Sequence, residues 1–164
     1  MRVTLEELIE VIHQSPHIDC GGGATAEELA QAQADLGIII PGCYGMILRL
    51  FGWLSVGSWE LFGLGSQTPP HLHLVAMVTE ERRSSRRSLP ISLLPVMNNG
   101  GGDLFCLELE SADAEGDCPV RLWDHRLGLV NPWDSGLIVP DESESFCTWL
   151  ANAVRGEFEA ETSI

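Results

Sequence analysis

The chain has 164 residues, of which 45% are hydrophobic, and a domain of this size buries roughly 70% of the surface that its unfolded chain exposes. It carries 24 acidic residues against 9 basic ones, all of them arginine, so its formal net charge is -15. This charge argues against binding to nucleic acid or to an anionic membrane, and it favours a cationic partner. The absence of lysine excludes a Walker-type phosphate loop, a Schiff-base mechanism and a lysine general base.

The cysteines are odd in number and lack C-x-x-C spacing, which predicts reduced thiols and no disulfide framework. The first residues, MRVTLEELIEVI, place acids within an apolar periodicity, unlike a signal peptide. Gly, Pro and Arg49 interrupt the longest apolar runs, so we expect no transmembrane span. These features together predict a cytoplasmic protein. The five cysteines are Cys20, Cys43, Cys106, Cys118 and Cys147.

Two capping boxes mark the starts of the first two helices. Thr4 and Thr25 each stand three residues before a glutamate, Glu7 and Glu28, so that hydroxyl and carboxylate satisfy each other's exposed amides. Apolar residues at helical spacing follow both boxes. Gly37 stands where the second helix needs a C-terminal cap.

The middle of the chain continues this pattern. Residues 17–24, HIDCGGGA, are predicted to form a turn-rich linker, and a third helix is predicted from Pro41 to about residue 51. Residues 58–65, SWELFGLG, predict a short strand that ends in a turn. A helix is expected from Pro69 onward, because proline suits a first helical turn. Four arginines near its end complement the helix dipole: Arg82, Arg83, Arg86 and Arg87.

The second half predicts three consecutive strands and a closing helix. The strands are expected at residues 91–97, 103–109 and 119–125, separated by turn-forming segments. The last helix is expected to begin with Ser143 as its cap. Helices, an antiparallel meander and a final helix predict a single α+β domain over residues 1–164, with a mainly antiparallel central sheet flanked by N-terminal helices and one C-terminal helix. Residues 155–164 are expected to form a short acidic tail.

The glycine-rich stretch NNGGGDLFCLEL does not fit a phosphate-binding loop. Counting from Gly100, the dinucleotide fingerprint requires a third glycine where Phe105 stands. A strand also follows the glycines, whereas a phosphate site requires a helix N-terminus. The stretch therefore predicts a turn into a half-buried strand, with Leu104 and Cys106, or the alternate set, facing the core.

No other motif in the chain predicts catalysis. His71 and His73 would share a face on a strand but not on the expected helix, and no acid or cysteine lies close to them in sequence. No serine occupies a G-x-S-x-G motif. We therefore expect no enzymatic activity, no metal site and no cofactor.

Two interpretations remain open for each of two polar segments. Trp123, Asp124 and His125 either form a recognition spot at a strand end, or Trp123 packs in the core while Asp124 caps the turn. The arginines between residues 82 and 87 either grip an acidic partner or RNA, or form a solvated face neutralised by the chain's own acids.

An ordered set of segments resembles the SUKH superfamily, named partly after fungal regulators of cell-wall assembly. The segments are TAEELAQAQADLGIIIPGCYGMILRLFGW, LFGL, LLPVMNNGGGDLFCLEL, GDCPVRLWDH and SESFCTWLANAV, within residues 25–154. The chain departs from the family pattern in having GCYG where an acid usually precedes the tyrosine, and its turn retains only Asp103. The resemblance implies a single α+β domain. Most bacterial members look like immunity proteins, which bind and block a cognate toxin domain, often a nuclease.

The hypothesis that follows is a cytoplasmic immunity-type protein that neutralises a basic toxin domain by stoichiometric binding. The alternative is a non-enzymatic scaffold or regulatory interaction module, as the fungal relatives suggest. The expected contact surface is centred on a strand end, with acids around it. It comprises Trp123, Asp124, His125, Asp103, Glu108, Glu110, Asp113, Glu115 and Asp117.

Overall fold

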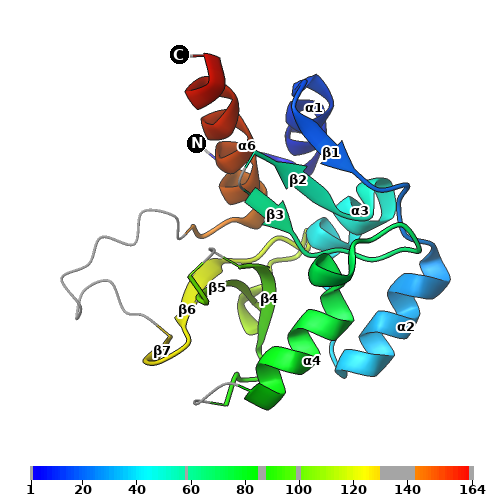
Figure 1. Ribbon diagram of the computed structural model, residues 1–164, viewed down its shortest axis with the longest axis vertical. Helices are drawn as coiled ribbons and strands as arrows, with labels where there is room; N and C mark the ends of the chain where they lie inside the picture. The colour runs from blue at the N-terminus through cyan, green and yellow to red at the C-terminus, as the bar shows by residue number, and fades with distance from the viewer. Residues whose placement is uncertain (1, 58, 85–87, 99–100, 130–142, 163–164) are drawn as a thin grey trace.

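The computed structural model describes residues 2–57, 59–84, 88–98, 101–129 and 143–162, without the side chains of 84 and 157–162. Within these residues it forms a single α+β domain, as predicted (Figure 1). The helices are α1 (Leu5–Gln14), α2 (Ala26–Leu36), α3 (Gly42–Phe51), α4 (Leu74–Ser84) and α6 (Phe146–Thr162), with short 3-10 turns η1 (Pro70–Leu72) and η2 (Leu109–Ser111).

Seven strands form one sheet, in which each strand pairs antiparallel with its neighbour in chain order. The three strands predicted in the second half are present as β4, β5 and β6. Three further strands were not predicted, because two or three residues are too few to show an alternating pattern. The strands are β1 (Ile18–Cys20), β2 (Leu54–Val56), β3 (Trp59–Leu61), β4 (Leu93–Asn98), β5 (Leu104–Glu108), β6 (Val120–Asp124) and β7 (Gly128–Leu129).

Two elements, β1 and α6, differ from what the sequence predicted. β1 lies inside residues 17–24, which were predicted to be a linker, and it pairs with β2. α6 begins after Ser145, whose hydroxyl oxygen accepts from the Thr148 backbone N–H at 3.1 Å. The predicted cap, Ser143, instead pairs with Val120 at the start of β6 and keeps the chain extended there. α6 also continues to Thr162, through most of the segment expected to be a tail.

The predicted helix caps are otherwise confirmed. Thr4 and Thr25 both form complete capping boxes, with Glu7 and Glu28. Gly37 ends α2 with φ of 67°, a left-handed conformation that glycine adopts without steric cost. These local signals fix where α1 and α2 begin and where α2 ends.

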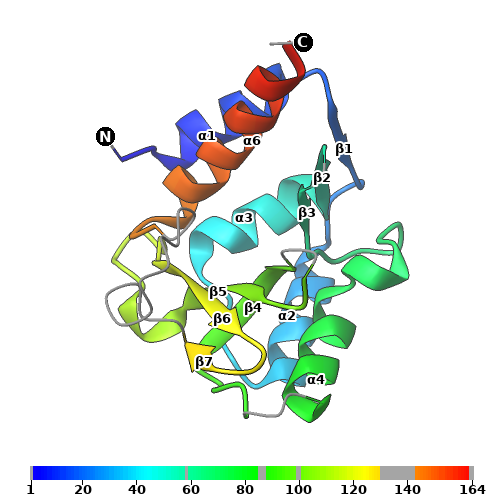
Figure 2. The same ribbon diagram turned by 60° about the vertical axis from the view of Figure 1, so that its left-hand side comes forward.

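Helices cover both faces of β5. α1 packs against α6, and α2 packs against α4 (Figures 1 and 2). The ring of Phe105 lies 5.4 Å from that of Trp149 on α6. Cys106 points to the opposite face, where its burial raises its pKa and the charge of Glu81 on α4 adds to the effect. Residues 104–107 are all buried, so β5 is not the half-buried strand that was predicted.

The described part of the chain has no helix that combines the length and the apolar character needed to cross a membrane. α3 is instead part of the core. The Tyr44 hydroxyl donates to the carbonyl of Phe62 at 2.7 Å, and the Tyr44 ring packs edge-on against Phe146 of α6. Burial raises the pKa of Tyr44, which therefore stays a neutral donor. All five cysteines are free thiols; Cys20 is exposed and the other four are buried.

Candidate functional site

The predicted contact residues occupy two opposite ends of β5 and β6. Asp103, Asp124 and His125 lie where β5 starts and β6 finishes, and we call them the histidine end. Residues 108–117 run from the last residue of β5 toward β6, and we call them the acidic loop. Since β5 has five residues, the two ends are about 17 Å apart. The structure therefore does not gather the predicted residues into one cluster.

At the histidine end, Asp103 holds His125 in place. One carboxylate oxygen, Oδ1, accepts from the His125 backbone N–H at 3.1 Å and lies 2.8 Å from His125 Nδ1. The ring lies over Gly102, which has φ of 96° and where an added Cβ would come within 3.3 Å of Nδ1. The glycine-rich turn thus makes room for the histidine. The His125 side chain is 46% exposed.

The two residues before His125 have structural roles. Asp124 Oδ1 accepts from the backbone N–H groups of Arg126 and Leu127 at 2.7 and 3.1 Å, and these bonds, chiefly the one from Arg126, lower the pKa of Asp124. Trp123 is buried, with 5% of its surface exposed. Both observations match the interpretation in which Trp123 packs in the core and Asp124 caps the turn. His125 is the member of this trio that a partner can reach.

Asp117 anchors the end of the acidic loop inside the protein. It is only 4% exposed. Its Oδ2 accepts from the Ser145 hydroxyl at 2.6 Å and from Arg2 at 3.1 Å. Its Oδ1 accepts from the backbone N–H groups of Cys118 at 2.9 Å and Cys147 at 3.4 Å. Asp117 therefore joins the acidic loop to the N-terminal segment and to the start of α6.

Asp113 closes the acidic loop on itself. Its Oδ1 accepts from the backbone N–H groups of Glu115 and Asp117 at 2.9 and 3.0 Å. Its other oxygen pairs with Arg2. The hydrogen bond from Arg2, followed by that from Asp117, lowers the pKa of Asp113. Asp113 and Asp117 thus shape the loop, and both pair with the single guanidinium of Arg2.

Two carboxylates of the acidic loop remain open to solvent. Glu108 is paired with Arg121, which also contacts Glu144. Glu110 and Glu115 are both exposed, and neither takes part in an ion pair with any residue that the structure describes. Their charges are therefore available to a cationic partner.

Sequence reasoning missed the partners that hold the acidic loop. Arg2 lies 111 residues before Asp113, and no local pattern indicates such a contact. Ser145, two residues after the residue predicted as the helix cap, is the closest signal that the sequence offered.

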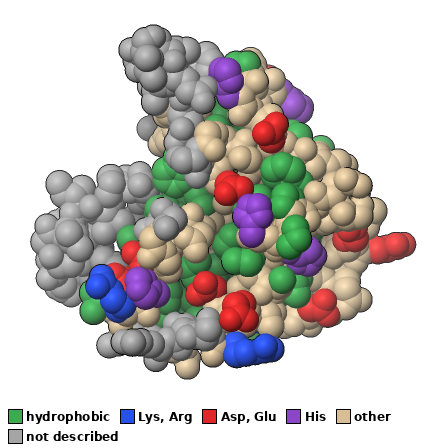
Figure 3. Space-filling model, in the orientation of Figure 1, with side chains coloured by type: hydrophobic (Ala, Val, Ile, Leu, Met, Phe, Trp, Pro, Cys, Tyr) green, Lys and Arg blue, Asp and Glu red, His purple; other side chains and the backbone are tan. Residues whose placement is uncertain are grey.

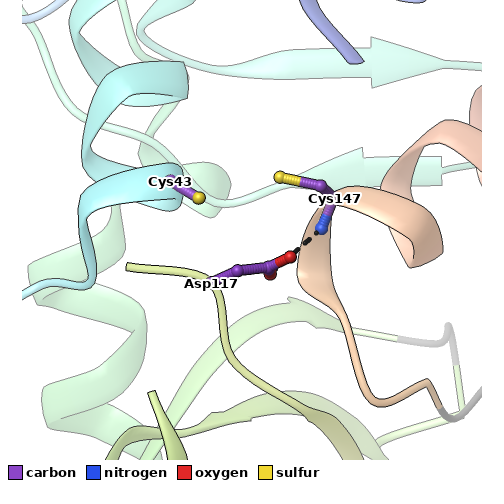
Figure 4. A group of neighbouring side chains, drawn as sticks. All are labelled: Cys43, Asp117 and Cys147. Atoms are coloured by element: carbon purple, nitrogen blue, oxygen red, sulfur yellow. Dashed lines mark hydrogen bonds between the residues drawn. The ribbon is translucent and has the colours of Figure 1, made fainter. Parts of the chain in front are cut away.

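A separate cluster brings three buried side chains of metal-ligating type together. Its members are Cys43, Asp117 and Cys147 (Figure 4).

The two histidines singled out in the sequence, His71 and His73, lie in different structural contexts. His71 lies in η1, with Nε2 3.0 Å from a carboxylate oxygen of Glu60. His73 follows η1 and forms an isolated β-bridge with Gly63. The prediction that both histidines lie on one continuous α-helix is therefore wrong. Among the described residues, neither histidine belongs to a cluster of three ligand-type side chains.

The arginine segment contributes at least one contact within the fold. Arg82 donates to the carbonyl of Leu36 at 2.9 Å, at the C-terminal end of α2, and its burial lowers its pKa. Arg83 is exposed, while Arg86 and Arg87 lie outside the described residues. Arg82 thus joins α4 to α2, a role that neither sequence interpretation included.

Acidic side chains are distributed over the face drawn in Figure 3. They lie among hydrophobic, neutral and histidine side chains, and the basic groups visible there lie toward its lower margin. The acidity of the chain is therefore a property of a broad surface. The acidic loop is tied to two distant segments of the chain, the N-terminal segment and the start of α6.

The fold places the chain in the class of small α+β domains in which helices cover both faces of an antiparallel meander. A family model described as SMI1-KNR4 cell-wall, SUKH_5, matches residues 5–154. The chain therefore belongs to the SMI1-KNR4 family of the SUKH superfamily, as the sequence resemblance predicted. The match begins some twenty residues before the resemblance did and so includes α1.

A solved structure supports the same fold. It is described as a crystal structure of a protein from Pseudomonas syringae pv. tomato, and it has 19% sequence identity and a TM-score of 0.63. The similarity covers 90% of this chain and 95% of that one. No curated protein sequence matches the chain.

Proposed function

We propose that the protein is a cytoplasmic immunity-type protein that binds a cognate toxin domain and neutralises it stoichiometrically. The proposed partner is a basic protein domain, with a nuclease as the leading candidate, and the mechanism involves no catalysis, cofactor, nucleic acid or membrane. Family membership supports the proposal, because most bacterial SUKH proteins look like immunity proteins that bind and block a toxin domain. A net charge of -15 supports a cationic partner.

The observation that carries the proposal is the construction of the acidic loop. Asp113 and Asp117 fix its backbone through Arg2 and Ser145, while Glu110 and Glu115 remain exposed. Charges on a fixed backbone lose little conformational freedom when a partner binds. A nuclease needs a basic groove for phosphates, and an acidic surface is steered toward such a groove, with faster association at low salt.

The histidine end supplies a second contact in this proposal. A standard protein interface covers about 800 Å² on each partner, which is roughly 30 Å across. The separation of about 17 Å between the two ends is smaller than this. One toxin domain is therefore large enough to contact Glu110, Glu115, Asp103 and His125 together. Trp123, Asp124 and Asp117 support this surface from inside.

The burial of Trp123 and Asp124 changes which variants test the proposal. Replacing both with alanine would remove a core side chain and a turn cap, so a loss of binding would not identify a contact. Variants of His125, Glu110 and Glu115 change exposed side chains instead. These are the informative positions.

The test of the function is co-expression with the C-terminal domain of a toxin encoded by a neighbouring gene. We expect growth rescue and a complex of one protein to one toxin domain on a sizing column. Absence of both would contradict the immunity function for that toxin. The name of the matching family, SMI1-KNR4 cell-wall, favours a scaffold or regulatory module as the second candidate. That candidate predicts a complex with a host protein and no growth rescue.

A further inference from the structure

We propose that Cys43, Cys147 and Asp117 form a binding site for a thiophilic divalent cation of the Zn²⁺ type. The three side chains come from α3, from α6 and from the segment between the acidic loop and β6. Their sulfur and oxygen atoms all lie within 4.8 Å of one another, and all three residues are buried. Figure 4 shows the two sulfur atoms pointing toward each other, with the Asp117 carboxylate beside them.

The spacing of the donor atoms suits a tetrahedral ion. Zn²⁺ binds sulfur at about 2.3 Å and carboxylate oxygen at about 2.0 Å, which separates neighbouring ligand atoms by roughly 3.5 Å. The three atoms need to approach one another by about 1.3 Å at most to reach this geometry. A further oxygen donor lies near, since the Glu115 carbonyl is 3.6 Å from Cys43 Sγ.

The types of ligand select the kind of ion. Two thiolates favour zinc and copper(I), whereas magnesium and calcium prefer oxygen ligands only. A carboxylate as the third ligand favours the divalent zinc type over copper(I). We therefore assign the site to Zn²⁺, with Co²⁺ as a spectroscopic substitute.

Burial raises the pKa of both Cys43 and Cys147, so the two thiols keep their protons until a metal ion displaces them. Cys43 is the second residue of α3 and Cys147 the second residue of α6, and the positive end of a helix dipole stabilises a thiolate. Binding replaces the two thiol protons with one ion and releases both protons to solvent. Two thiolates and the Asp117 carboxylate leave the bound cation with one excess negative charge, and the Arg2 guanidinium, which also pairs with Asp113, lies 3.1 Å from Asp117.

Asp117 can take part without losing its anchoring contacts. Its short hydrogen bonds, from Ser145 and Cys118, are 2.6 and 2.9 Å long. Its bond from the Cys147 backbone N–H is 3.4 Å long and therefore weak. Turning Oδ1 toward an ion replaces that weak bond. The ion would then join α3, α6 and the acidic loop at one point.

The test is the metal content of the full chain. Protein loaded with Zn²⁺ and desalted should retain about one ion per chain, and the Co²⁺ form should show sulfur-to-metal charge-transfer absorption. Cys43→Ala or Cys147→Ala should each weaken Zn²⁺ binding by at least about tenfold. Cys20→Ala and Cys106→Ala, which remove an exposed and a buried thiol outside the cluster, should retain the ion.

Three results would overturn the proposal: no retained Zn²⁺ in the wild type, equal binding by the Cys43→Ala Cys147→Ala variant, or a Cys43–Cys147 disulfide in the purified protein. Thermal unfolding without metal checks that each variant is folded. The charge-transfer spectrum is recorded on the wild type, so it decides the question even where a variant fails to fold. The test uses metal alone and is independent of any toxin.

Discussion

The acidic loop and the histidine end lie at opposite ends of β5 and β6, yet they are held by different kinds of contact. The acidic loop depends on residues far away in sequence: Arg2 is 115 residues from Asp117, and Ser145 is 28. The histidine end depends on a turn cap within three residues of Asp124, and on the contact between Asp103 and His125, 22 residues apart.

This difference indicates how each end responds to change. A substitution in the frame of the acidic loop disconnects the N-terminal segment, the loop and α6 together. A substitution at the histidine end disturbs one turn. The predictions below test this contrast, in order of decreasing expected effect.

The largest effect is expected from Asp117→Ala. The change leaves the Ser145 hydroxyl and two backbone N–H groups without their acceptor in a buried place, so we expect a loss of about 3 kcal/mol in the free energy of unfolding. Urea denaturation measures it. Ser145→Ala removes one of these bonds together with the cap of α6 and should cost about 1–2 kcal/mol. A loss below about 1 kcal/mol for Asp117→Ala would contradict the anchoring role.

A smaller effect is expected from Gly102→Ala at the histidine end. The backbone φ of 96° strains any side chain there, and the new Cβ would press on the His125 ring at 3.3 Å. We expect a loss of about 1–2 kcal/mol in the free energy of unfolding. The NMR signals of the His125 ring should move while those of Asp117 and Ser145 stay in place. Unchanged His125 signals would show that Gly102 does not position the ring.

The next effect is a pH dependence of the free energy of unfolding, which comes from the Asp124 carboxylate. Its pKa in the folded state lies below the ordinary value of 3.8, so its ionised form stabilises the fold above about pH 4, and this contribution is lost as the pH falls through the folded pKa. The difference in unfolding free energy between wild type and Asp124→Asn should therefore shrink on acidification. Urea denaturation at several pH values measures this. A difference that stays constant or grows would disprove it.

The smallest effect is expected from Arg2→Gln, because Arg2 is exposed and surface ion pairs contribute little to global stability. The change should instead loosen the acidic loop locally. Hydrogen exchange of the Glu115 and Asp117 amides, which donate to Asp113, should become a few-fold faster. Arg126→Gln is the matched control at the histidine end and should leave these two amides unchanged. Equal exchange in both variants would contradict a role for Arg2 in holding the loop.

The sequence predicts the elements that carry local signals. Two capping boxes located the starts of α1 and α2, Gly37 located the end of α2, and runs of apolar residues located β4, β5 and β6. β1, β2 and β7 escaped because strands of two or three residues form through pairing with neighbours, which a local pattern does not record.

The sequence singled out the acids of the loop but did not reveal their roles. Asp113, Asp117 and Glu110 look alike as acids in one loop. Only the fold shows that the first two are bound by Arg2, while Glu110 is exposed. Burial and charge pairing depend on segments more than a hundred residues away, so they cannot be inferred from spacing along the chain.

The proposed immunity function depends on attraction between the toxin and the open carboxylates of the acidic loop. This attraction is tested most directly by measuring association rates with the purified toxin domain encoded beside the gene. We expect Glu110→Gln Glu115→Gln to bind about tenfold more slowly than wild type at low salt, with a weaker salt dependence. Glu27→Gln Asp35→Asn removes the same charge from exposed positions on α2, which packs against α4 and α3, and should change the rate by less than about twofold. Equal rates for the two double variants would contradict the claim.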